Sequence, residues 1–241
     1  MTQKSEHSED LMVCSQETQS DAFIIELPHI EQAGNWDCGL ACVQMVLSQN
    51  LALQLLQNLS TICPEEYQNR STWTIDLCYI LNHFSVKIKY YTKTLGVNPN
   101  FSQEKFYDSY ILKDEARVNQ RFAAAASKGI SIETGSLELN DLIHHIKQNG
   151  VAIALIDVNQ LECVSCKSLI KDFGNFMRTL LKPQLPFSGH YIVICGFDTN
   201  KKLMYYRDPA VKSELCCLTF SSFEIARQAH GTDEDIILIH L

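Results

Sequence analysis

The spacing of apolar residues changes near residue 150, and this change constrains the fold more than any other feature of the sequence. Before that point apolar residues recur mostly with helical spacing, as in STWTIDLCYILNHF over 71–84. After it come β-branched and aromatic runs bounded by Gly, Asp, Asn and Pro, namely VAIALI, YIVICGF, LMYYRD and DIILIHL. Helices followed by strands predict an α+β fold, in which a mainly antiparallel sheet packs against the early helix.

Capping signals place the individual helices. The first is expected to open at Cys38 in WDCGLACVQMVL, and a short second one to cover about 52–60. Three later helices are expected. The first has Ser71 or Thr72 as its N-cap, the second has Asp114 as a cap and Gly129 as its stop, and the third is bounded by Asn140 and Gly150. Between them VKIKYY, over 86–91, alternates as a strand with one wet face.

The composition supports one compact domain behind a short tail. Residues 1–22 are polar and acidic, which is typical of disorder, whereas 23–241 contain no Gly/Ser/Pro-rich linker and no repeat. With 241 residues and 46% hydrophobic content, the chain can bury a full-sized core. We therefore expect a disordered acidic tail over 1–22 and a single domain over 23–241.

Charge and cysteine content narrow the function classes. A net charge of -8 leaves no basic surface to replace phosphate counterions, so nucleic acid is not an expected partner. No stretch approaches the roughly 18 apolar residues of a membrane span, and the N-terminus lacks the pattern of a secretory signal. The ten cysteines are then expected to be reduced thiols, in the cytosol or also the nucleus.

Cys38 is the first candidate for chemistry. A thiol at the first turn of a helix meets unpaired N–H groups and the positive end of the helix dipole, which favour the thiolate. Gly39 would leave room for a substrate chain close to the backbone. The alternative is that Cys38 is a packing residue, as many helical cysteines are.

His190 and Asp208 are the matching candidates for a base and its orienting group. If YIVICGF and LMYYRD form a hairpin centred near residue 200, paired positions sum to roughly 400 and Asp208 lies opposite or diagonal to His190. Gln32, in a predicted turn six residues before Cys38, has a side-chain amide suited to an oxyanion. Taken singly, each of these residues also has an ordinary reading, as a strand-start His, an Asp-Pro turn and a solvated Gln.

Gln32, WDCGLACVQMV, GHYIVICGFD and RDPA, in this order, resemble the papain-like cysteine peptidases, especially those that process bacteriocin leaders. That resemblance implies a papain-like fold, with Cys38 as nucleophile, His190 as general base, Asp208 as its orienter and Gln32 in the oxyanion hole. Over about 23–241 the chain also resembles the eukaryotic guanylyl-cyclase-domain-containing family, through WDCGLAC, STWTIDLCYILNHF, TLGV, ARVNQRFA, GHYIVICGF and GTDEDIILIHL. The name of this second family implies production of cyclic GMP from GTP.

Three functions follow as alternatives: cysteine-dependent hydrolysis or acyl transfer on a peptide or protein, GTP cyclisation, and partner binding with little turnover. A cyclase needs carboxylate-held metal and phosphate-binding groups, yet the sequence has no Gly-rich phosphate loop. The acidic run TDEDI is expected to be a solvated start to the last strand.

No cofactor or metal is predicted. Cys163 and Cys166 have zinc-ligand spacing, but neither a second such pair nor the adjacent His144 and His145 completes a site. Cys163 and Cys166 fall in a segment over 157–188 that is rich in Lys, Phe and Pro and is long enough to cover a cleft. Oligomeric state is left open.

Overall fold

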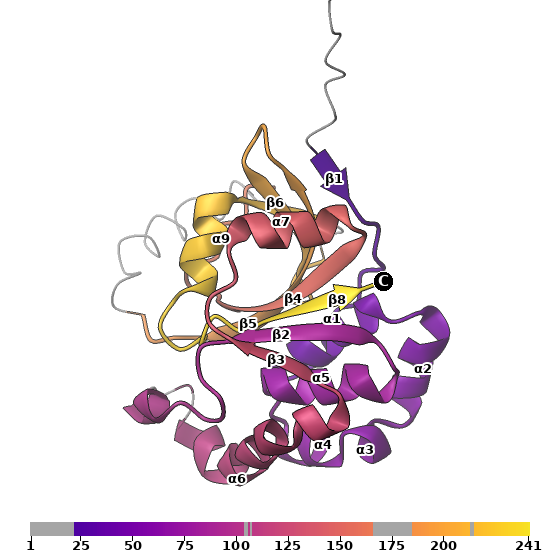
Figure 1. The fold of residues 1–241 in the computed structure, drawn as a ribbon, viewed down its shortest axis with the longest axis vertical. Helices are drawn as coiled ribbons and strands as arrows, with labels where there is room; N and C mark the ends of the chain where they lie inside the picture. The colour runs from indigo at the N-terminus through magenta and orange to yellow at the C-terminus, as the bar shows by residue number, and fades with distance from the viewer. Residues whose placement is uncertain (1–21, 104–105, 107, 166–184, 213–214) are drawn as a thin grey trace, which may run out of the picture.

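The computed structural model describes residues 22–103, 106, 108–165, 185–212 and 215–241 (Figure 1). The helices are α1 (Cys38–Val46), α2 (Gln49–Gln57), α3 (Leu59–Ile62), α4 (Pro64–Asn69), α5 (Thr74–His83), α6 (Asp108–Ala124), α7 (Leu139–Lys147) and α9 (Phe220–Arg227), with the 3₁₀ turns η1 (Pro99–Gln103) and η2 (Ala126–Lys128). The strands are β1 (Ala22–Ile24), β2 (Lys87–Thr92), β3 (Ser131–Thr134), β4 (Gly150–Asp157), β5 (Gly189–Asp198), β6 (Leu203–Arg207), β7 (Cys216–Thr219) and β8 (Ile236–His240).

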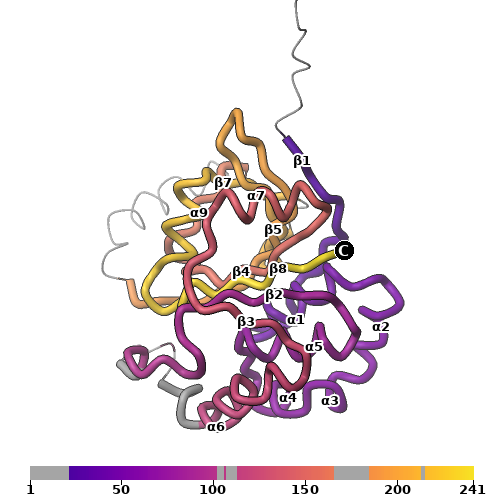
Figure 2. The backbone as a smooth tube through the Cα atoms, viewed as in Figure 1, coloured from indigo at the N-terminus to yellow at the C-terminus, as the bar shows by residue number. Residues whose placement is uncertain are grey.

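The strands form one sheet in the order β3-β2-β8-β4-β5-β6-β7, with β1 added to β5. The β2–β3 pair is parallel and the other pairs are antiparallel, so the predicted α+β class with a mainly antiparallel sheet is confirmed. The last strand of the chain, β8, lies between β2 and β4 rather than at an edge, as Figure 2 shows. The C-terminal segment therefore lies beside segments from the first half of the chain.

The central strands are covered on both faces. Every residue of β4 is buried, and its side chains divide alternately between two apolar clusters. Val151, Ile153 and Leu155 belong to the cluster that includes α1 and α5, whereas Ala152 and Ala154 belong to the one that includes α7 and α9. Figure 1 shows these helix pairs on opposite sides of the sheet. A strand buried on both faces reads as a continuous apolar run, as VAIALI does.

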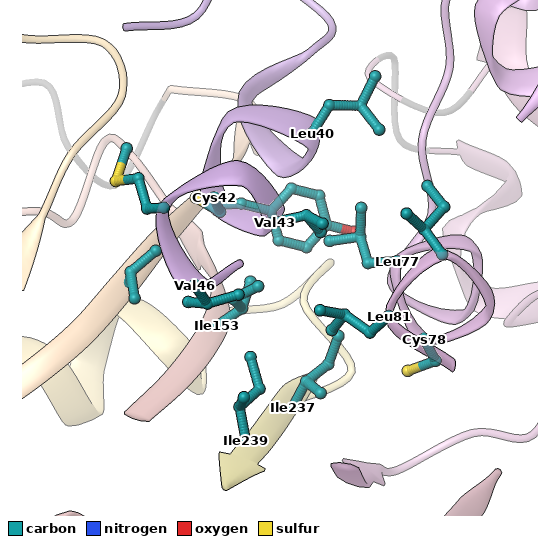
Figure 3. Close-up of a cluster of buried hydrophobic side chains, with 14 of the residues drawn as sticks. Leu40, Cys42, Val43, Val46, Leu77, Cys78, Leu81, Ile153, Ile237 and Ile239 are labelled. Atoms are coloured by element: carbon teal, nitrogen blue, oxygen red, sulfur yellow. The ribbon is translucent and has the colours of Figure 1, made fainter. Parts of the chain in front are cut away.

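The packing between α1 and the sheet fixes the position of the helix start. Figure 3 shows Val43 and Val46 from α1 facing side chains of α5 and of strands β4 and β8, and Leu40 belongs to the same apolar cluster. The partners labelled there are Leu77, Leu81, Ile153, Ile237 and Ile239. Burying each such side chain contributes about 1.5–3 kcal/mol, so α1 is held against the sheet along its length. The prediction that the early helix packs on the sheet is confirmed.

Several predicted helix ends were wrong. The expected helix over 52–60 is two helices, α2 and α3, and α5 has Trp73 rather than Ser71 or Thr72 at its N-cap position. The Asp76 carboxylate accepts a hydrogen bond from the Trp73 backbone N–H at 2.9 Å, which satisfies an amide at the helix start.

Asp114 lies inside α6 and does not cap it. Its buried carboxylate pairs with Arg117 at 3.0 Å and accepts a hydrogen bond from Trp73 Nε1 at 3.1 Å. Arg117 and Arg121 also pair with Asp76 of α5. The aspartate is therefore used to join helices rather than to begin one.

The remaining helix stops lie close to the expected residues. Gly129 ends η2 in the left-handed region, with φ 79°, as a stop residue should. Asn140 lies inside α7, the left-handed turn after this helix is at Asn149 with φ 60°, and Gly150 already belongs to β4.

Some predictions fall outside the described residues. The tail over 1–22 does so except for Ala22, which pairs with Asp198, and so do residues 166–184 of the segment over 157–188. In the described ranges, no helix is long and apolar enough to cross a membrane.

Candidate active site

Cys38 is the first residue of α1 and is 9% exposed. Asp37 occupies the N-cap position but makes no side-chain cap hydrogen bond. Its carboxylate instead accepts the backbone N–H groups of Ala33 at 3.0 Å and Gly34 at 2.8 Å, which folds residues 33–37 into a tight turn. The first amides of α1 therefore keep their free donors and the positive dipole end next to the thiol.

Gly39 serves helix packing, which corrects the expectation that it leaves room for a substrate. A Cβ at this position would lie 3.0 Å from both δ carbons of Leu77 and 3.1 Å from Tyr191 Cδ2. The missing side chain lets α1 approach α5 and β5 closely.

His190 and Asp208 are in direct contact. His190 Nε2 lies 2.8 Å from Asp208 Oδ1, and both side chains are buried. Val193 lies opposite Arg207, and these two residue numbers sum to 400, as predicted for a hairpin centred near residue 200. Nearer the turn, a bulge between Ile194 and Gly196 shifts the pairing by one residue. The Asp208 carboxylate also accepts the Ala210 backbone N–H at 2.9 Å, which fixes it at the end of β6.

The electrostatics tie the imidazole to the thiol as well as to the carboxylate. Burial lowers the pKa of His190, but hydrogen bonds with Asp208 and with Cys38 outweigh it and raise the pKa to about 9. For Asp208, burial raises the pKa and the hydrogen bond with His190 and its charge bring it below the ordinary value. Because Nε2 is taken by Asp208, Nδ1 is the ring nitrogen left for the Cys38 thiol.

The Gln32 side chain is engaged locally. Its Nε2 donates to the Gly34 carbonyl at 2.6 Å, and its Oε1 is buried without a hydrogen-bond partner in the described structure. The Gln32 backbone N–H donates to the Pro209 carbonyl at 3.0 Å, which docks this loop beside Asp208. Gln32 thus lies at the same end of the fold as the thiol, but it does not line the cavity described next.

A cavity of about 80 Å³ opens beside Cys38. Its walls include Trp36, Thr74, Tyr191, Asp233 and Asp235. The acidic run before β8 was therefore predicted wrongly as solvated: Thr232, Glu234 and Asp235 are at most 9% exposed. The cause is the central place of β8, which carries the preceding loop into the interior.

His29 is a residue near the candidate site that the sequence patterns do not identify. Its charge lowers the pKa of Asp208, after the larger effects of burial, His190 and Ala210. Both ring nitrogens of His29 are buried without a hydrogen-bond partner in the described part of the chain. A histidine in the turn PHIEQ carries no periodicity or spacing signal, so only the folded chain reveals its proximity to Asp208.

The candidate metal ligands that the structure describes do not converge on one site. Within the described ranges, no group of three or more His, Cys, Asp or Glu side chains is placed to hold a metal ion. His145 is buried against the carbonyls of Val151 and Ile239, whereas His144 contacts Gln148. Cys163 lies 3.2 Å from Ser165 Oγ, and Cys166 falls outside the described residues.

A thiol at a helix start, set against an antiparallel sheet that supplies a histidine and an aspartate, is the arrangement of the papain-like fold. A solved structure described as a C39-like peptidase from Bacillus anthracis shares this fold, with a TM-score of 0.50 and 12% identity over 91% of this chain and 98% of that one. The chain belongs to the guanylylate cyclase family, which matches residues 27–239. It is 37% identical over 219 residues to "Guanylyl cyclase 1" of Arabidopsis thaliana, covering 90% of this chain and 76% of that protein.

Proposed function

We propose that the protein is a cysteine-dependent hydrolase or acyl-transfer enzyme acting on a peptide or protein. The observation that carries the proposal is the 2.8 Å hydrogen bond between His190 and Asp208, together with a thiol at Cys38 close enough to His190 to help raise its pKa. Nucleophile, base and orienting group in this order are what thiol catalysis requires.

In the proposed reaction the Cys38 sulfur attacks a carbonyl carbon, and a C–S bond forms while the carbonyl oxygen becomes an oxyanion. The first amides of α1 and the second N–H of Gln32 Nε2 are the proposed donors to that oxygen. His190 takes the thiol proton and gives it to the leaving group as the C–N or C–O bond breaks. A water or a second nucleophile then gives its proton to His190 and attacks the thioester carbonyl, and the C–S bond breaks as the sulfur leaves and takes that proton. Asp208 keeps the imidazole oriented throughout.

Selective alkylation tests the nucleophile. Burial raises the pKa of Cys42, Cys63, Cys78 and Cys195, in the case of Cys63 to about 12 and of Cys195 to about 11. At pH 6, limiting iodoacetamide followed by peptide mass spectrometry should therefore label Cys38 first, and His190→Ala should slow that labelling about 10²-fold or more.

Cys217 is the internal control for this experiment, since it is half-buried and more accessible than Cys38. Equal labelling rates at Cys38 and Cys217 would contradict the enzyme proposal. If the His190→Ala variant folds and still labels at the original rate, His190 is not the base.

GTP cyclisation is the second candidate, and membership of the family together with the name of the Arabidopsis relative favours it. In that reaction the ribose 3′ oxygen attacks the α-phosphorus and pyrophosphate leaves, with divalent metal neutralising the phosphates. Purified protein incubated with GTP and Mn²⁺ should then yield cyclic GMP by mass spectrometry, and Cys38→Ala should leave the yield intact. Our thiol proposal expects no cyclic GMP above a no-protein blank.

Partner binding with little turnover is the third alternative. Such a domain should retain its partners when Cys38 is replaced by alanine, with acyl-enzyme formation absent in both forms. Trapping of a labelled acyl group on Cys38 from a peptide thioester, followed by its release by hydroxylamine, would decide for the enzyme.

A further inference from the structure

The lining of the cavity beside Cys38 includes a buried carboxyl group. Asp235 lines the cavity and is 9% exposed, and its Oδ1 has no hydrogen-bond partner in the described structure. The backbone N–H of Leu155 donates to the Asp235 carbonyl at 3.0 Å, which anchors this residue to β4. Thr74 lines the same cavity, its hydroxyl lies 2.9 Å from the Tyr191 hydroxyl, and it also lowers the pKa of Asp235.

Hydroxyl groups surround the carboxyl group. Hydrogen bonds from Thr74, Thr92 and Tyr90 favour its ionised form, but burial outweighs them and raises the pKa of Asp235 to about 7. Burying a carboxyl group with an unpaired oxygen costs free energy unless a ligand provides the missing donor. The site is thus incomplete without an occupant that donates hydrogen bonds.

Asp233 adds a second carboxylate to the same wall. Thr94 Oγ1 and Asn98 Nδ2 donate to its Oδ1 at 3.1 and 2.7 Å. The loop that presents both aspartates is strained, since Asp233 and Glu234 have φ values of 48° and 53°. Non-glycine residues in this region cost about 1–3 kcal/mol each, which is typical of a backbone held for a site.

Acidic groups outnumber cations in the described lining of the cavity. Glu234 turns to Lys93 and Arg227, outside the cavity, and among the described lining residues Arg70 is the one cation. Arg70 is exposed and also lines the neighbouring groove, so it stands at the rim. Trp36, Trp73, Phe106, Phe122 and Tyr191 supply aromatic walls.

We propose that this cavity is the recognition pocket of the thiol site and that it takes a primary ammonium on an aliphatic stem, as in a lysine side chain. The inference rests on the proposed function for its place in a reaction and on Asp235 for its chemistry. Aromatic walls attract a cation and accept an apolar stem, and the carboxylates and threonine hydroxyls accept its three N–H donors. A guanidinium fits less well, because its planar fork pairs best with both oxygens of a carboxylate and only Oδ1 is free here.

A binding assay on the Cys38→Ser variant tests the pocket without any chemistry. Nα-acetyl-lysine amide should bind about tenfold or more tightly than the neutral Nα-acetyl-norleucine amide in calorimetric titration, since a charged hydrogen bond is gained. Asp235→Asn should abolish the preference for the lysine amide, and Asp233→Asn should weaken it. Glu133→Gln, which alters an exposed carboxylate outside the cavity, is the matched control.

Thermal unfolding of each variant identifies any that fail to fold, and Asp233→Asn then serves in place of Asp235→Asn. Equal affinity for the two amides, or a preference that survives both substitutions, would overturn the proposal. Stronger binding of Nα-acetyl-arginine amide would overturn the choice of ammonium over guanidinium.

Thiol labelling separates this inference from the proposed function. In the wild-type chain, 2-aminoethyl methanethiosulfonate should modify Cys38 about tenfold faster than the neutral methyl reagent, relative to their rates on Cys217. If Cys38 reacts with both reagents at the same relative rate, the pocket proposal fails and the nucleophile stands. If the lysine amide binds but Cys38 is inert to every reagent, the proposed function fails and the pocket stands.

Discussion

At the scale of single residues, the pKa of His190 is set by its surroundings. It is 7% exposed, and burial alone would remove its charge. Contacts with Asp208 and Cys38 reverse that effect and raise its pKa to about 9. The imidazolium form is therefore favoured at neutral pH.

Replacing Asp208 with asparagine should lower the pKa of His190, because a neutral amide no longer stabilises the imidazolium. Titration of the His190 ring by NMR gives the pKa directly, near 9 in the wild type. Asp198→Asn is the control, since that carboxylate lies at the other end of β5 and pairs with Lys201. An unchanged His190 pKa in Asp208→Asn would show that the pair does not set it.

The same substitution should alter how stability depends on pH. A folded pKa above the unfolded value of about 6.5 stabilises the fold below pH 6.5, and that contribution is lost as pH rises towards 9. Urea unfolding between pH 6 and 9.5 should show a shallower decline in the free energy of unfolding for Asp208→Asn than for Asp198→Asn.

At the scale of elements, the closeness of α1 to α5 decides where the thiol lies. Gly39 faces the two δ carbons of Leu77, which is fully buried and cannot move into solvent. A glycine normally weakens a helix by about 0.5–1 kcal/mol relative to alanine, so this one is retained for the contact it permits.

Gly39→Ala should destabilise the fold by about 1–3 kcal/mol, because overpacking outweighs the gain in helix propensity. Leu77→Val removes both contacting δ carbons. The Gly39→Ala/Leu77→Val double variant should therefore lose about 1 kcal/mol less free energy of unfolding than the two single variants lose together. Urea unfolding of the four proteins measures this coupling. Leu142→Val, in the apolar cluster on the other face, should combine additively with Gly39→Ala, and equal coupling at both sites would contradict the packing explanation.

At the scale of the whole molecule, the sheet order joins the two halves of the chain. The loop that carries His29, Gln32 and Asp37 follows β1, which lies against β5 at Gly196. A Cβ at Gly196 would lie 2.5 Å from the Phe23 carbonyl oxygen, so the two backbones touch. The position of that loop beside Asp208 thus depends on a contact far along the chain.

Gly196→Ala should displace β1 and loosen this loop. Amide hydrogen exchange should accelerate at Ile25, which donates to the Cys195 carbonyl at 2.7 Å, and at Gln32, which donates to the Pro209 carbonyl. The amides of β4 serve as the control and should keep their protection. Unchanged exchange at Ile25 would mean that β1 does not depend on the close approach.

Much of the fold could be read from local patterns. Apolar spacing identified α1, α5, β2, β4, β5, β6 and β8, and a short turn near residue 200 fixed the pairing that brings Asp208 to His190. These succeed because helix period, strand period and hairpin register are set by neighbours along the chain. Asp114 was misread because a carboxylate's partner across two helices leaves no trace in its own segment.

The sequence by itself determined that a thiol opens a buried helix and that a histidine and an aspartate meet across a hairpin, because both are short-range consequences of backbone geometry. Only the tertiary structure decided that Leu77 and Tyr191 occupy the space next to Gly39, that His29 lies near Asp208 and that Asp235 lines the cavity beside Cys38. The position of Asp235 depends on β8 lying between β2 and β4, and the position of His29 depends on β1 lying against β5. Strand order is set by burial of the whole core rather than by any local pattern.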